Sequence, residues 1–175
     1  MIALLVAAIL AANTVWPEEP VPDYGIADGM CRVHEKGPAL LVSAAGLRDR
    51  TGKLRLELYA PNDTDFLADD RELVRDGKVF RRAVIDVPAT GPVELCVRPP
   101  RAGTWSVALI HDRAGAKKFK ISSDGIGFGG NPHLGLSKPK AEVSEIDVGA
   151  GVTRASVRLN YRHGLFSFGP LDGVK

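Results

Sequence analysis

Several short segments of the chain alternate apolar and polar residues, the pattern of β-strands with one buried face. The clearest lies at 53–60, where Leu54, Leu56 and Leu58 alternate with polar or aromatic residues. A period of two places these leucines on one side of a sheet, so we expect them to face a core. A continuous apolar run predicts a strand at 39–47. Alternating patterns predict further strands at 79–87, 93–98, 104–112, 141–148 and 152–161.

The connections between these segments are rich in residues that form turns. The 19 glycines and 12 prolines are scattered rather than periodic. One acidic connection, 65–74, also carries apolar residues that one or two helical turns would direct inward. At 175 residues the chain has the size of one domain. The pattern therefore predicts an all-β fold, a two-layer antiparallel β-sandwich of about seven strands with a short helical insertion.

Composition divides the chain into four parts. Residues 1–12 form an apolar run that is too short to span a bilayer, and we interpret it as a signal peptide, with an uncleaved anchor as the alternative. The proline-containing segment 13–30 predicts an extended linker or arm. The sandwich domain is expected over 31–161, followed by a C-terminal tail at 162–175. We therefore expect a periplasmic or secreted protein without a membrane span after removal of the signal.

Cys31 and Cys96 are the two cysteines of the chain. In an oxidising compartment one disulfide is favoured over two separate buried thiols, which are the alternative. The bridge would close a loop of about 65 residues and contribute roughly 4 kcal/mol in the chain-entropy model. Cys96 is out of phase with Leu95 and Val97, so the bridge is expected to pin the N-terminal arm across the outside of the sheet.

Charge is nearly balanced, with 23 basic and 21 acidic residues and a formal net charge of +2. Nucleic-acid binding depends on a surplus of basic residues that neutralise phosphates. The sequence therefore does not predict a nucleic-acid partner.

Four segments in a fixed order carry a family resemblance: ALLVSAAGLRDRTGKLRLELY at 39–59, GTWSVALIHD at 103–112, GIGFGGN at 125–131 and VTRASVRLNY at 152–161. Together they resemble the domain of unknown function 2141 family over roughly 39–161. The resemblance implies an exported bacterial β-sandwich of immunoglobulin-like or prealbumin-like type. It implies no activity.

The loop after His111 and Asp112 departs from the pattern of that family. The family carries an Asp- and Asn-rich run there, whereas this chain has RAGAKKFK at 113–120. Calcium takes six to eight oxygen ligands, and only Asp112 and Asp124 remain as carboxylates beside several basic residues. We therefore predict no metal site in the loop.

The chain offers no recognisable catalytic constellation and no cofactor motif. His111 shares a strand phase with Trp105 and Val107, so we expect a packed imidazole at the edge of the core. Asp112 points to the opposite face, which excludes a direct acid–base dyad with His111. The glycines at 125–130 lack the Lys-Ser/Thr ending of a phosphate-binding loop, so close packing explains them better.

These observations favour a non-enzymatic binding or structural module of the cell envelope that acts through the 112–139 loop region. Its binding candidates are His111, Asp112, Asp124 and Asn131, and its partner is an unidentified envelope component or protein. The alternative is a hydrolase-type enzyme that uses an exposed His111 with a nearby carboxylate. A carrier of small ligands is disfavoured because the inward leucines are bulky enough to fill the interior.

Overall fold

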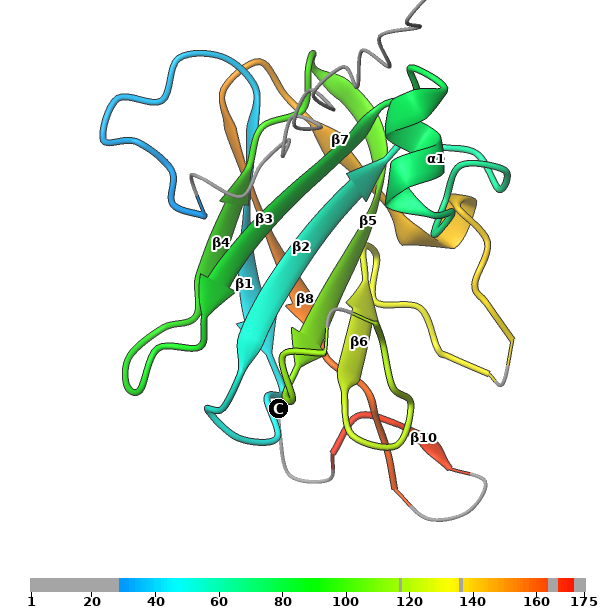
Figure 1. Ribbon diagram of the computed structural model, residues 1–175. Helices are drawn as coiled ribbons and strands as arrows, with labels where there is room; N and C mark the ends of the chain where they lie inside the picture. Colours follow the sequence, from blue (N-terminus) through cyan, green and yellow to red (C-terminus); the bar gives the residue numbers. More distant parts are fainter. Residues whose placement is uncertain (1–28, 117, 136, 164–166, 172–175) are drawn as a thin grey trace, which may run out of the picture.

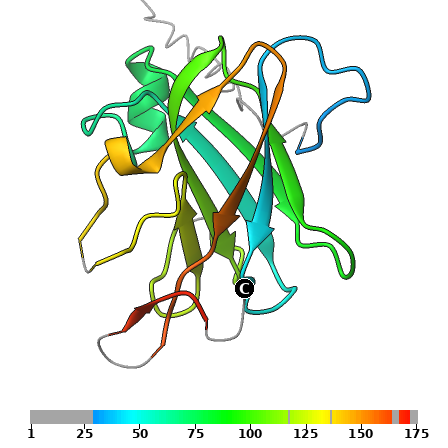
Figure 2. The same ribbon diagram turned by 180° about the vertical axis from the view of Figure 1, so that it is seen from behind.

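The computed structural model describes residues 29–171 except 117, 136 and 164–166. The predicted signal peptide and nearly all of the predicted arm therefore lie outside the described residues. Two β-sheets pack face to face (Figures 1 and 2). The first contains β4 (Glu94–Val97), β1 (Ala39–Ala45) and β8 (Val152–Arg158), in that order. The second contains β3 (Phe80–Asp86), β2 (Lys53–Tyr59), β5 (Gly103–Asp112) and β6 (Gly125–Phe128), with β7 (Glu145–Val148) also paired to β5.

The prediction of an all-β sandwich with a short helix is confirmed, with two differences in the strands. The glycine-rich turn contains β6, and the predicted strand at 141–148 begins as a 3-10 turn, η1 (Glu142–Ser144), before β7. Two further short strands, β9 (Tyr161–Arg162) and β10 (Phe168–Gly169), form a hairpin near the end of the chain.

One strand pair is parallel, against the antiparallel prediction. β1 and β8 run side by side with Val42 opposite Ala155. The reason lies in the connection before β8: the chain leaves the second sheet at the end of β7 and turns through 149–151 into the first sheet. That turn is at the same end of the sandwich as the start of β1, so both strands run in one direction (Figure 2).

The interior lies between the two sheets. Leu54, Leu56 and Leu58 are fully buried there, as their alternation predicted. They pack against apolar side chains from the first sheet, including Leu40 and Val157. The bulky residues that the alternation places inward therefore form one continuous core.

A second apolar cluster covers the outer face of the second sheet. Tyr59, Phe80 and Phe128 point outward from the sheet and pack against Phe66 and Leu134 from the long connections. The helix α1 (Asp70–Arg75) lies in the first of these connections (Figure 1). It is shorter than the predicted 65–74 because the Asp69 side chain accepts hydrogen bonds from two amides of the first turn and so caps the helix there.

The predicted disulfide between Cys31 and Cys96 is present. Cys96 is fully buried beneath the described part of the arm, and its amide donates to the Gly29 carbonyl at 2.8 Å. Neighbouring residues of a strand point to opposite faces, so Cys96 lies on the outer side of the first sheet while Leu95 enters the core. The α1 and η1 segments, the helices of the described residues, lack the length and apolar character needed to cross a bilayer.

Candidate functional site

His111 lies near the end of β5 and is fully buried. Its Nε2 lies 2.7 Å from the Thr51 carbonyl oxygen, and its Nδ1 lies 2.7 Å from the Tyr161 hydroxyl. A carbonyl can only accept, so Nε2 carries the proton and Nδ1 accepts from the Tyr161 hydroxyl. The Arg48 amide in turn donates to the Tyr161 oxygen at 3.2 Å. The neutral imidazole therefore has a partner at each nitrogen.

Burial lowers the pKa of His111 below its ordinary value, although the hydrogen bond to Thr51 and the nearby Asp49 carboxylate act in the opposite direction. The Asp49 carboxylate itself lies 4.0 Å from Nε2. It is held by the Arg113 guanidinium, whose Nε donates to it at 2.8 Å, and by Thr51. Burial opposes ionisation of Asp49, but these hydrogen bonds prevail and lower its pKa to about 2.

Asp112 and Asp124 border the basic loop, and both are almost completely buried. The Asp112 carboxylate accepts from the Ala116 amide at 3.0 Å. Asp124 accepts from the Lys120 amide at 2.8 Å through one oxygen and from the Arg113 amide at 3.3 Å through the other. The two carboxylates therefore bind backbone groups of the loop and fix its path.

Asn131 joins the loop after β6 to the edge of β8. Its side-chain amide donates to the Ser156 carbonyl at 2.8 Å and accepts from the Arg158 amide at 2.6 Å. These are the contacts that a neighbouring strand would make, so the side chain takes the place of a strand at this edge. Its backbone has a φ of 51°, in the left-handed region that asparagine tolerates.

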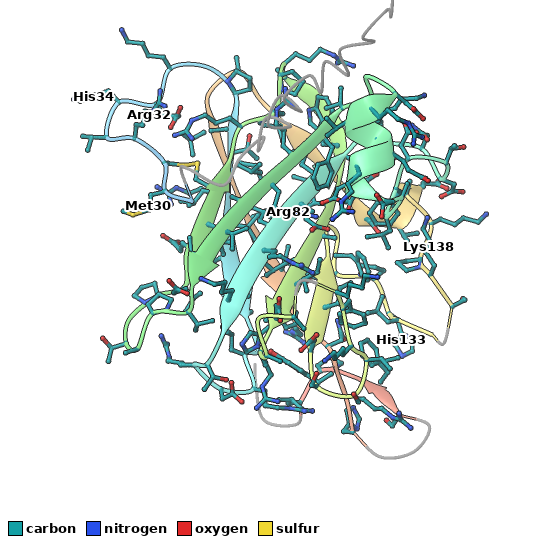
Figure 3. All side chains as sticks on the ribbon, in the orientation of Figure 1. Met30, Arg32, His34, Arg82, His133 and Lys138 are labelled. Atoms are coloured by element: carbon teal, nitrogen blue, oxygen red, sulfur yellow. A yellow bond between two sulfur atoms is a disulfide. The ribbon has the colours of Figure 1, made fainter. Side chains whose placement is uncertain are left out.

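A shallow pocket of about 480 Å³ opens beside Asn131. Its walls come mainly from three parts of the chain: the loop 131–134, the edge of β8, and the segment 168–170. His133, which Figure 3 labels, lines it together with Phe128, Phe168 and Arg158. The four predicted site residues thus do not converge: Asn131 lines this pocket, whereas His111, Asp112 and Asp124 lie at the base of the basic loop.

Comparison with known families matches residues 42–156 to a family described as "Uncharacterized protein conserved in bacteria (DUF2141)". The chain belongs to this family. The match covers most of the chain and confirms the resemblance. A search of curated proteins and a search of solved structures each found no match.

In this DUF2141 chain the glycines of β6 are explained by close packing. A Cβ added at Gly125 would lie 2.3 Å from the Tyr161 ring, and one at Gly127 would lie 2.4 Å from the Arg158 carbonyl oxygen. Both distances are shorter than real Cβ contacts, so a side chain at either position would push the strand away from its neighbours. The motif thus lets β6 approach Tyr161, the partner of His111.

Sequence reasoning missed several residues that complete the site of this DUF2141 chain. Tyr161, Thr51 and Asp49 contact His111 or its neighbours, yet they lie 50 or more positions away from it in sequence. The one sequence signal that includes them is the set of family motifs, since Asp49 and Thr51 lie in the segment 39–59 and VTRASVRLNY ends at Tyr161. Membership of a motif did not show that the three residues meet. Among the described residues, three metal-ligating side chains meet only at Cys31, Glu35 and Cys96, where both sulfurs belong to the disulfide.

Proposed function

We propose that the protein is a non-enzymatic binding module of the bacterial cell envelope that presents its basic loop, residues 113–121, to an acidic partner. The proposal rests on the hydrogen bonds of Asp112 and Asp124, the two acidic residues that border the loop. Both carboxylates are turned toward backbone amides of the loop. The side chains that the loop exposes are therefore basic or apolar: Lys118, Phe119, Lys120 and Ile121.

Two features of the chain support a location outside the cytoplasm. A disulfide between Cys31 and Cys96 is typical of proteins in oxidising compartments. The apolar run at 1–12 has the length of a signal-peptide core. Together they support a periplasmic or secreted protein. The domain bounds that we propose for it are a sandwich at 31–161 and a tail at 162–175.

The hydrolase alternative gains no support from the geometry at His111. An enzyme of that kind needs an imidazole that reaches its substrate. This imidazole is fully buried, and both of its nitrogens are engaged by Thr51 and Tyr161. The binding proposal requires only the exposed surface of the loop.

Co-sedimentation with insoluble peptidoglycan sacculi, an acidic envelope glycan, tests the proposal. We expect the protein to sediment with sacculi at low salt and to be released as salt increases. The double variant Lys118→Glu/Lys120→Glu should bind about tenfold less, because each reversal replaces an attractive contact by a repulsive one.

The matched control is Lys78→Glu/Lys140→Glu, which changes the net charge equally at two exposed lysines outside the loop. It should bind sacculi nearly as well as the unaltered chain. Equal loss of binding in both double variants would show that net charge, and not the loop, governs retention. Absence of binding to sacculi and to a soluble polyanion such as polygalacturonate would contradict the proposal.

A further inference from the structure

The described part of the arm ends in a tip, residues 30–36, that projects from the side of the sandwich. Figure 3 shows Met30, Arg32 and His34 on this projection. Val33 is 93 % exposed and Met30 is 77 % exposed, the two highest values among the large apolar residues that the structure exposes. Apolar side chains grouped on one projection mark a surface that contacts something else.

The tip is attached to the sandwich at both of its ends. Cys31 is bonded to Cys96, and the Gly29 carbonyl accepts from the Cys96 amide. At the other end the Glu35 carboxylate accepts from the Arg98 guanidinium in two contacts, at 2.8 and 2.7 Å. The exposure of Val33 therefore belongs to a loop whose position is fixed by covalent and ionic contacts.

These contacts also determine the charge that the tip presents. Its acid, Glu35, has a side chain that is 3 % exposed, and the hydrogen bond from Arg98 lowers its pKa to about 2. Arg32, His34 and Lys36 are exposed around Val33. With Arg98 included, three basic side chains accompany one acid, so the tip itself is basic as well as apolar. Asp86 and Glu94 line the pocket beside Met30 and Arg32, so the basic excess belongs to the tip and not to the whole face.

We propose that the tip is a contact site for an anionic lipid surface. Val33 and Met30 enter the headgroup region, while Arg32 and Lys36 lie among the lipid charges. Apolar side chains framed by basic ones are the composition of interfacial contacts, and each basic residue near an anionic leaflet strengthens attachment. This contact is separate from the basic loop, which lies at the opposite end of the sandwich (Figures 1 and 2).

The position of the tip in the chain supports this partner. Residues 13–28 join the tip to the apolar run at 1–12, whose composition is that of a segment directed to membranes. The tip is thus the first described part of the chain after that run. Where the run is retained as an anchor, the alternative to its cleavage, it keeps the tip within reach of a lipid surface. The charge of the tip supports a lipid partner in either case.

A tryptophan placed at the tip reports contact with lipid directly. We would compare the full-chain variants Val33→Trp and Ile121→Trp, because Ile121 is also an exposed apolar residue next to a lysine. Vesicles contain phosphatidylcholine with brominated acyl chains, with or without an equal share of phosphatidylglycerol. We expect bromine to quench the added emission of Val33→Trp on anionic vesicles more strongly than that of Ile121→Trp, because Val33 is 93 % exposed and Ile121 only 52 %.

Charge removal provides the second measurement. Arg32→Gln/Lys36→Gln in the Val33→Trp background should need about thirty-fold more anionic lipid for half-maximal quenching, since each basic residue contributes about fivefold. Lys78→Gln/Lys140→Gln, which removes two exposed charges outside both the tip and the basic loop, is the matched control and should change the titration little. Circular dichroism during heating verifies that each variant keeps the fold.

Three results would overturn the proposal. The first is quenching of Val33→Trp that does not exceed that of Ile121→Trp on anionic vesicles. The second is equal quenching on neutral and anionic vesicles, which removes the role of charge. The third is a response of the tip tryptophan to polygalacturonate but not to vesicles, which assigns the tip to an acidic glycan. None of them affects the binding of sacculi by the basic loop.

Discussion

The buried side chain of His111 stabilises the fold as a neutral imidazole, because both of its ring nitrogens are hydrogen-bonded in that form. Its Nε2–H donates to the Thr51 carbonyl, while Nδ1 accepts from the Tyr161 hydroxyl. A proton added at Nδ1 removes the acceptor of the Tyr161 hydroxyl, and the Tyr161 oxygen would then accept from both Nδ1 and the Arg48 amide. The hydroxyl hydrogen of a fully buried side chain would need a new acceptor, which opposes protonation in the same direction as burial and agrees with the lowered pKa.

This arrangement predicts a pH dependence of stability. The folded pKa of His111 is lowered, so the unfolded chain binds more protons between its ordinary pKa of about 6.5 and the folded value. The contribution of His111 to the free energy of unfolding therefore has its full value above that ordinary pKa. It falls as the pH drops below the ordinary pKa, by up to about 1.4 kcal/mol per pH unit. Urea unfolding at a series of pH values measures the slope.

The variant His111→Gln should lose this slope, whatever its effect on stability at neutral pH. The exposed His133 provides the control, and His133→Gln should keep the slope of the unaltered chain. A stability that stays constant through the titration range of histidine would contradict the prediction. Asp49 contributes in a separate window, since its lowered pKa of about 2 affects stability only under more acidic conditions.

Among the elements of secondary structure, β6 depends most clearly on its glycines. It pairs with β5, with Ile110 opposite Ile126, and its other side meets the chain near Asn160. Gly125 faces the Tyr161 ring and Gly127 faces the Arg158 carbonyl, with no room for a Cβ at either position. A glycine-rich segment that looks like a turn in sequence is thus a strand that requires small residues for close approach.

We predict that Gly125→Ala destabilises the fold by about 1–3 kcal/mol, the usual cost of overpacking a well-filled site. The added Cβ would lie 2.3 Å from the Tyr161 ring, which is fully buried and therefore has little room to move. Thermal and urea unfolding measure the loss. Gly135→Ala is the matched control, because no atom lies within 4 Å of a Cβ there, and comparable stability of the two variants would disprove the packing argument.

At the scale of the molecule, the sandwich separates two surfaces of similar chemistry. The tip at 30–36 and the basic loop at 113–121 lie at opposite ends (Figure 1). In each, a carboxylate is turned inward to hold the segment: Glu35 binds Arg98, while Asp124 binds loop amides. Both segments therefore expose basic and apolar side chains. If both proposals hold, the protein would contact a lipid surface at one end and an acidic partner at the other.

The disulfide is expected to stabilise the whole molecule without forming part of its core. Cys31→Ser/Cys96→Ser should lower the free energy of unfolding by about 2–4 kcal/mol, since an open chain gains entropy when it unfolds. The β-sheet signal in circular dichroism should remain, because the buried leucines lie between the sheets and away from the bridge. A loss below about 1 kcal/mol in urea unfolding, or equal stability of the reduced and oxidised unaltered chain, would contradict this expectation.

The sequence by itself determined the faces of the strands and the family, and it favoured the disulfide that the structure contains. Alternation at Leu54, Leu56 and Leu58 identifies a buried face because side-chain direction in a strand depends only on position along it. The bridge could be predicted because the chain has two cysteines, so only one pairing within it exists. Each of these inferences uses local spacing or counting and needs no knowledge of which strands are neighbours.

Tertiary structure alone decided the pairings and the roles of the site residues. The parallel register of β1 with β8 and the contact of His111 with Tyr161 join segments far apart in sequence. Alternation says which face a residue occupies and nothing about the strand beside it, so such contacts cannot be read from it. Asp124 likewise looked like a ligand for a partner, yet the folded loop supplies that partner from its own backbone amides.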